Sequence, residues 1–343
     1  MRMHVRIVIT SAVALAIGLV AATQAPAGPA VVDPVKVNPD VWEDFPAAAD
    51  AGMNSLIAWT ADGKSTPDRF DAFLQVNGGP RIKVNPEKTR GYTGAFASGT
   101  DRLVWQQVKK GQSDLRFYDV SAGAGVPLGR SDVNTSLWQW RPSIDGDHLL
   151  YGENRFDAPD APWKVVLVDL GDPNQTKRVL ATAKNRCRCL YPGQISGNYA
   201  TWTKCSPVCQ VFVHQIDTAT TTRVINEPQK QQYFGVPNAN GVTYLVRSGN
   251  ACGANAQIVA VPLGSESRQL VHVLDEGKDV NDISTVPGSS FPEPVYFSRF
   301  GCGQAGQANI YSTNVLPPTR IAPDVGRSIT GRKRLQLPAG SLP

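Results

Sequence analysis

Six cysteines are the residues of this sequence whose chemistry is easiest to anticipate. They are Cys187, Cys189, Cys205, Cys209, Cys252 and Cys302. The chain starts with an export signal, described below, and an even number of cysteines in an exported chain predicts disulfides. A zinc site made from the first four thiolates is the alternative, but zinc sites more often use a Cys-x2-Cys spacing. We therefore predict three disulfides, no metal and no cofactor.

Motifs of the common catalytic centres are absent from the sequence. It contains no G-x-S-x-G nucleophile turn, no H-E-x-x-H pair and no Walker A loop. Beyond the export signal the only histidines are His148, His214 and His272, and we interpret these isolated side chains as structural. Asp145-Gly146-Asp147 lacks the acidic ladder of a calcium loop and is interpreted as a β-turn. Two carboxylates brought together by folding would leave no motif, so an enzyme with such a pair is the alternative.

A repeat of about 47 residues provides the elements that would position any site. In each repeat a tight turn leads into a short apolar strand that ends in an aromatic residue. The six aromatics are Trp59, Trp105, Tyr151, Trp202, Tyr244 and Tyr296. The strands that follow them are predicted over 70–76, 114–120, 164–170, 210–216, 257–261 and 308–313. Several of these alternate apolar and polar residues, which is typical of half-buried strands.

Strand-turn-strand units at this period predict an all-β fold, a six-bladed β-propeller of four-stranded antiparallel blades. An irregular array of β-sandwiches is the alternative. The segments 142–151 and 194–202 resemble the blade signature of TolB-like six-bladed propellers, in which Pro, Ser or Asp, Gly and a strand-ending aromatic recur in each blade. The resemblance covers about residues 46–324 and implies the fold only. We expect the extra N-terminal domain of TolB to be missing, so its partners are not carried over.

Aromatic and basic residues form the candidate ligand-binding set. Four aromatics lie where the chain enters a blade from the one before it, 11 or 13 residues before the repeated aromatic and near the central funnel, and three arginines fall on the same face. The set is Tyr92, Trp140, Arg141, Tyr191, Tyr233, Arg247 and Arg299. One interpretation is a stacking surface for a sugar or peptide with donors for an anion. The other is packing between blades, with the arginines as solvated strand ends. Asp282 and Glu293 are the acidic candidates near the same funnel.

The cysteines are predicted to lie on this same face. In propellers the connections between blades and the loops after the second strand share one face, and all six cysteines fall in such segments. We expect Cys252 to pair with Cys302 across two neighbouring blades, and Cys187 and Cys189 to pair with Cys205 and Cys209. A local Cys205–Cys209 bridge is the alternative.

The chain is predicted to have four parts. Residues 1–27 are a secretory signal peptide, with Arg2 and Arg6 before an apolar run and Ala25-Pro26-Ala27 as the cleavage site. An uncleaved anchor is the alternative, but the run is shorter than the about 20 residues of a span, and we expect no transmembrane span after cleavage. Residues 28–45 can supply a strand that closes the ring, 46–324 form the propeller, and 325–343 form a basic tail.

Composition limits the function classes. The 343 residues are 41% hydrophobic and 18% charged, which suits a sizeable core and not a disordered chain. A net charge of +5 is too small to indicate a nucleic-acid partner. We expect a monomer, secreted or held in the cell envelope, that acts as a non-catalytic binding module for a protein or carbohydrate. The alternative is a propeller enzyme of the glycoside hydrolase, lyase or lactonase type with carboxylates in the funnel.

Overall fold

The computed structural model describes residues 35–36, 43–51, 54–62, 70–97, 100–128, 130–155, 161–172, 174, 177–184, 189–289, 294–303 and 308–313. The chain divides into two compact units, 1–30 and 31–343, and all of these residues belong to the second. The predicted signal peptide, the basic tail, Cys187 and Glu293 lie outside the described residues. No helix capable of crossing a bilayer occurs in the described ranges.

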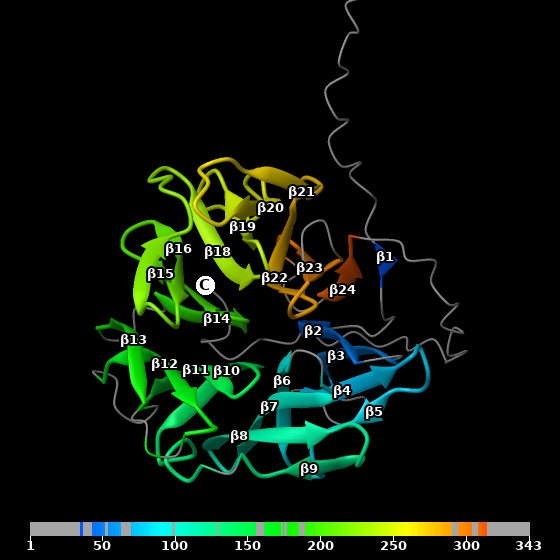
Figure 1. Ribbon diagram of the computed structural model, residues 1–343. Helices are drawn as coiled ribbons and strands as arrows, with labels where there is room; N and C mark the ends of the chain where they lie inside the picture. Colours follow the sequence, from blue (N-terminus) through cyan, green and yellow to red (C-terminus); the bar gives the residue numbers. More distant parts are fainter. Residues whose placement is uncertain are drawn as a thin grey trace, which may run out of the picture. The chain divides into compact units, whose positions relative to one another are not determined.

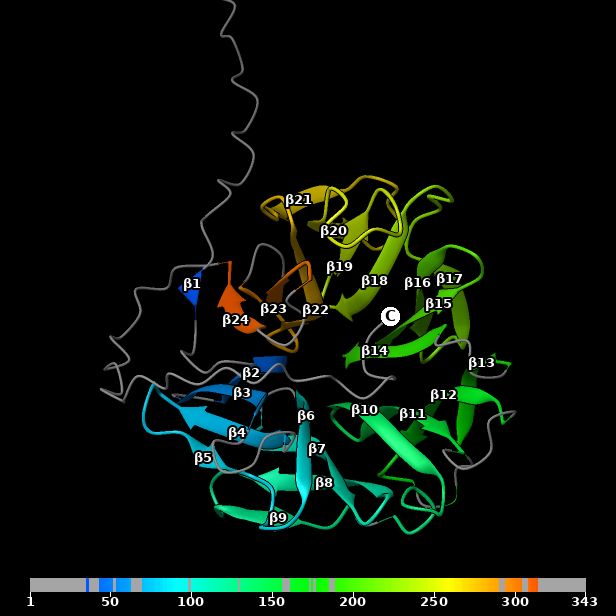
Figure 2. The same ribbon diagram turned by 180° about the vertical axis from the view of Figure 1, so that it is seen from behind.

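Six four-stranded antiparallel sheets surround a common axis (Figure 1), and the same arrangement is visible from behind (Figure 2). The innermost strands of neighbouring sheets contact each other in a closed circle, β2–β6–β10–β14–β18–β22–β2. The fold is therefore all-β and is a six-bladed β-propeller, as the repeat predicts.

Each blade is built from an innermost strand outward. The innermost strands are β2 (Glu43–Ala51), β6 (Arg90–Phe96), β10 (Trp138–Asp145), β14 (Leu190–Ser196), β18 (Gln231–Pro237) and β22 (Lys278–Thr285). The second strands are β3 (Asn54–Asp62), β7 (Arg102–Lys109), β11 (His148–Asn154), β15 (Tyr199–Cys205), β19 (Gly241–Arg247) and β23 (Val295–Gly301). The third strands are β4 (Phe70–Val76), β8 (Gln112–Asp119), β12 (Trp163–Asp169), β16 (Cys209–Gln215), β20 (Gln257–Pro262) and β24 (Asn309–Ser312). The outermost strands are β5 (Ile82–Lys83), β9 (Ala124–Val126), β13 (Arg178–Ala183), β17 (Thr220–Arg223), β21 (Gln269–Val273) and, in blade six, β1 (Val35–Lys36).

Blade six contains strands from both ends of the described chain. β1 pairs antiparallel with β24, with Val35 opposite Ser312 and Lys36 opposite Tyr311. The other three strands of this sheet are β22, β23 and β24. The ring is therefore closed by an N-terminal strand that completes the last blade.

Each hydrophobic core of the ring lies between two neighbouring blades. Trp105, for example, packs with Leu56 and Leu74 of blade one, and Tyr244 packs with Val211 and Val213 of blade four. Face-to-face packing of apolar sheet surfaces stabilises the ring because each blade buries one face against the next. The repeated aromatic thus serves as the wedge between consecutive blades.

The position of these aromatics differs from the sequence prediction in two ways. They do not end their strands: Trp105 and Trp202 are each the fourth residue of a strand that continues for at least three more. In blade six Tyr296 is half-buried, and the neighbouring Phe297 is the residue buried in the core between blades five and six. Successive residues of a strand point to opposite faces, so an assignment that is wrong by one residue selects the wrong side.

The described cysteines lie on one face of the ring, which we call the cysteine face. It is the side where the innermost strands begin and the second strands end. Cys252 is bonded to Cys302 between blades five and six, with their Cα atoms 5.7 Å apart, as expected.

The predicted pairing of Cys187 and Cys189 with Cys205 and Cys209 is wrong, because Cys205 is bonded to Cys209. These two residues are register partners where β15 turns into β16, so the hairpin itself brings their side chains together. Cys189 is also in a disulfide. The local bridge, the alternative considered from the sequence, is the correct one.

Candidate ligand-binding site in the central channel

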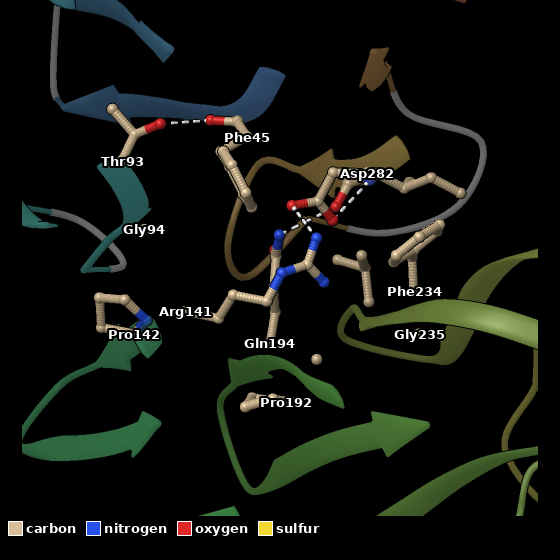
Figure 3. Close-up of a pocket in the computed structure, with 13 residues that line it drawn as sticks. Phe45, Thr93, Gly94, Arg141, Pro142, Pro192, Gln194, Phe234, Gly235 and Asp282 are labelled. Carbon is tan, nitrogen blue, oxygen red and sulfur yellow. Dashed lines mark hydrogen bonds and ion pairs between the residues drawn. The ribbon is translucent and has the colours of Figure 1, made fainter. Parts of the chain in front are cut away.

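Every innermost strand contains a β-bulge near its middle, where it has one residue more than the second strand. The pairing breaks lie between Asp44 and Ala47, Thr93 and Phe96, Trp140 and Ser143, Pro192 and Ile195, Tyr233 and Val236, and Val280 and Asp282. A bulge bends its strand and re-aims the side chains beside it. Residues at or beside these bulges line one pocket, and all thirteen belong to the innermost strands (Figure 3). Because all six blades contribute, the pocket lies on the axis of the ring.

Three of the bulges hold a non-glycine residue in the left-handed region. The φ angles are 50° for Phe45, 49° for Arg141 and 57° for Phe234. This conformation is unfavourable for L residues, by about 1–3 kcal/mol each, and where it occurs inside a strand it is a reason to look for a functional site. The three residues belong to blades one, three and five, and their side chains point into the channel (Figure 3).

Blades two and four have glycines, Gly94 and Gly193, at the corresponding bulges. A Cβ on Gly94 would overlap the carbonyl oxygen of Pro142 in blade three and would lie 2.8 Å from that of Val104. A Cβ on Gly193 would lie 2.5 Å from the carbonyl oxygen of Gly235 in blade five. The glycines therefore allow the innermost strands of neighbouring blades to approach each other closely.

Gly94→Ala is expected to lower the free energy of unfolding by about 1–3 kcal/mol, because the new methyl group meets backbone on two sides. Gly125→Ala is the matched control, since a Cβ there would be 3.7 Å from its nearest neighbour, an ordinary contact. Chemical denaturation of both variants measures the difference. Equal stability of the two would show that the blades can separate without penalty.

An ion pair spans the pocket from blade three to blade six. Nη2 of Arg141 is 3.1 Å from Oδ2 of Asp282, and both side chains are 16% exposed. The Cζ of Arg141 lies 5.0 Å from the ring centroid of Phe45 and 5.2 Å from that of Phe234. Both distances are in the range of cation–π attraction. The guanidinium is thus held between two aromatic rings and a carboxylate that come from three other blades.

Further hydrogen bonds cross-link the innermost strands around this pair. Gln194 of blade four donates from Nε2 to the carbonyl oxygen of Ile283 in blade six at 3.0 Å. The hydroxyl of Thr93 in blade two donates to the carbonyl oxygen of Phe45 in blade one. With Arg141 in place, the pocket has room for roughly one water molecule. The channel is therefore filled by its own side chains at the level of the bulges.

Burial raises the pKa of the Asp282 carboxyl above its usual 3.8. The attraction of Arg141 and the backbone N–H of Ile283 oppose this shift and favour the charged form. Desolvation is the larger effect, because a carboxylate enclosed by protein loses its hydration.

The stability of the protein relative to an Asp282→Asn variant is expected to fall as pH rises from about 3.8 through the raised pKa. In that window the native carboxyl binds more protons than the unfolded one, so unfolding becomes easier with rising pH. Above the window the difference is constant. Denaturation of both proteins across acidic pH measures this difference in the free energy of unfolding. If the native protein instead gained stability over Asp282→Asn as pH rises, the attraction of Arg141 would outweigh burial and the pKa would be lowered.

Of the candidate residues from the sequence, Arg141 lines the pocket. The four aromatics lie one or two residues before the bulges and pack on neighbouring rings. Tyr92 contacts Phe45 with centroids 6.0 Å apart, Trp140 contacts Tyr191 at 6.4 Å, and Tyr233 contacts Phe234 at 5.9 Å. Tyr92 and Tyr233 thus contact rings that line the channel, whereas Trp140 and Tyr191 contact each other.

The two other candidate arginines form ion pairs near the cysteine face. Arg247 pairs with the buried Asp279 at 2.8 Å, and its guanidinium lies 4.7 Å from the Tyr233 ring centroid. Arg299 pairs with Asp275 at 3.2 Å, and Asp275 is 72% exposed. Neither arginine lines the channel pocket.

Sequence reasoning did not select Phe45, Phe234 or Gln194 as site residues. Phe234 directly follows the selected Tyr233, and the same step leads from Trp140 to Arg141. In these two blades the residue directly after the aromatic lines the channel. Applying this rule to the sequence would have identified Phe234. Among the described residues, no cluster of three His, Cys, Asp or Glu side chains could hold a metal ion.

Comparisons with known proteins give similarity of fold. No protein-family profile and no curated relative matches the sequence. The TolB structure from Acinetobacter baumannii matches at TM-score 0.50 and 11% identity, over 75% of this chain and 63% of that one. A putative TolB from Agrobacterium tumefaciens matches at TM-score 0.52 and 12% identity, over 80% and 90%. An oligogalacturonate lyase in complex with manganese matches at TM-score 0.44 and 13% identity, over 75% and 73%. The described chain thus has the fold of a TolB-like six-bladed β-propeller.

Proposed function

We propose that this protein is an exported, non-catalytic binding module whose ligand docks in the central channel. The observation that carries the proposal is the convergence of six bulged strands on one charged pair enclosed by two aromatic rings. Three residues at this point have an unfavourable backbone conformation. Such conformations persist when the surrounding structure enforces them, and they gather at ligand-binding positions.

The charge inventory of the pocket favours binding over hydrolysis. A glycosidase needs two carboxyl groups, about 5–9.5 Å apart, on either side of the bond that it cleaves. Asp282 is the single carboxylate among the lining residues, and Arg141 already pairs with it. Its role in this arrangement is to hold a positive charge rather than to move a proton.

The disulfides support export of the protein. Two bridges are present in the described part of the chain, and such bonds persist in oxidising compartments outside the cytoplasm. A location in the cell envelope or outside the cell agrees with the signal peptide predicted for residues 1–27.

A thermal-shift screen of the oxidised protein against oligosaccharides and short peptides tests the proposal. A ligand at 100 times its Kd stabilises the native state by about 2.7 kcal/mol. We expect hits whose stabilisation is lost in Asp282→Asn and kept in Asp275→Asn. The second variant is the matched control because Asp275 also pairs with an arginine but lies outside the channel.

Two results would contradict the proposal. Consumption of a hit, with activity abolished by Asp282→Asn, would establish the enzyme alternative. Stabilisation that Asp282→Asn leaves unchanged would locate the binding site outside the channel.

A further inference from the structure

Three side chains around the Arg141 guanidinium are complementary to a positive charge. They are the rings of Phe45 and Phe234 and the carboxylate of Asp282. The face of an aromatic ring carries a negative potential, so rings and a carboxylate together attract cations and repel anions. The channel therefore contains a cation cage, made of these three residues.

The cage is built without any contribution from blade three, which supplies Arg141. Phe45 belongs to blade one, Phe234 to blade five and Asp282 to blade six. The Oδ1 atom of Asp282 accepts the N–H of Ile283 at 3.0 Å, which fixes the carboxylate and leaves Oδ2 for the cation. The three walls would therefore keep their places if the Arg141 side chain moved out.

Arg141 is held by a small part of its hydrogen-bonding capacity. Its Nη2 makes the ion pair and a 3.4 Å hydrogen bond to the carbonyl oxygen of Asn281. Among the described residues, its Nε and Nη1 have no hydrogen-bond partner. A guanidinium that binds a carboxylate through two N–H groups at once is held more firmly. The long side chain can leave without stranding any charge except that of Asp282, which a cationic guest would pair.

We propose that Arg141 is a built-in occupant of the cation cage and that the ligand of the channel carries a guanidinium group which takes its place. The inference rests on the proposed function, because it assigns the ligand to the same channel. The guest must exchange with Arg141 rather than bind beside it, since the occupied pocket has room for roughly one water molecule. Arg141 thereby keeps the channel closed until a competing cation arrives.

Removal of the occupant gives a direct test. Arg141→Gly empties the cage, and glycine suits the left-handed backbone at this position. Titration calorimetry then compares ethylguanidinium with its neutral analogue, ethylurea. We expect ethylguanidinium to bind Arg141→Gly about tenfold more tightly than ethylurea, and Asp282→Asn in the same background to remove this preference.

Arg223→Gly is the matched control for the empty cage. It also removes an arginine near a phenylalanine, Phe212, with a Cζ-to-centroid distance of 6.0 Å, but on an outermost strand. This variant should gain no ethylguanidinium binding. Equal binding of the two probes to Arg141→Gly, or a preference that survives Asp282→Asn, would overturn the cage. The proposed function would still stand if screening hits kept their dependence on Asp282.

If Arg141→Gly does not fold alone, the readout becomes the yield of folded protein on refolding with each probe. A higher yield with ethylguanidinium than with ethylurea supports the cage, and equal yields contradict it. The source of the cation is distinguished by comparing arginine amide with an alanine-flanked arginine peptide. Tighter binding of the peptide assigns a polypeptide ligand, and equal binding assigns a small cation; both results support the cage.

Discussion

Replacing Trp105 with alanine is expected to lower the free energy of unfolding by about 3–5 kcal/mol. The indole is 2% exposed and lies in the core between blades one and two, against Leu56, Leu74 and Phe96. Alanine would remove the largest side chain of this core. The rigid sheets on both sides cannot close the cavity, so the lost contacts are not replaced.

Trp138→Ala is the control for the Trp105 prediction, because the same side chain is removed from a half-buried position. Urea denaturation of both variants gives the two free energies. We expect Trp138→Ala to have less than half the effect. Similar losses would mean that the repeated aromatic does not act as the wedge between blades.

Loss of the Cys252–Cys302 disulfide, by alanine at both positions, is expected to lower the free energy of unfolding by about 4 kcal/mol. The bridge closes a loop of 50 residues in sequence, so cutting it gives the unfolded chain much more conformational freedom. Cys252 is exposed, so the substitution leaves no cavity at that end to complicate the measurement.

The Cys205–Cys209 bridge is the internal comparison. It joins residues only four apart, and the same chain-entropy argument gives it about 2 kcal/mol. Denaturation of both double-alanine variants under oxidising conditions should therefore rank the long bridge above the short one. The reverse order would show that native-state contacts, and not loop length, determine the stabilisation.

The fold could be predicted from sequence because its signal is repeated. The third strands fall within two residues of their predicted bounds, from Phe70–Val76 in blade one to Asn309–Ser312 in blade six. One aromatic per repeat is enough to mark the blades, even though it lies in the middle of its strand and not at the predicted end. In blade six the pattern points to Tyr296, whereas its neighbour Phe297 is the residue in the core.

The site could be predicted only in part. The sequence points to Arg141 only as one of three arginines on a face, and to Asp282 only as an acid near the funnel. Their pairing depends on bulges that re-aim single residues. A bulge with Phe or Arg in the left-handed region has no composition signal of its own, because those residues do not favour that conformation. The cage is therefore visible only once three distant segments, β2, β18 and β22, have been brought together.

The junction between blades six and one, where the N-terminal strand closes the ring, is the place where we expect the ring to open first. The core between blades six and one consists of Trp59, Ala61, Phe73 and Ile310, with Ile57 beside it. It is the smallest of the six cores in the described part of the chain. Partial unfolding starts where the fewest apolar groups must be exposed. We therefore expect amide hydrogens of β1 and β24 to exchange with solvent sooner than those of the other blades. The weakest junction adjoins Phe45, so breathing of the ring at this junction would loosen one wall of the cation cage and give Arg141 a route to leave.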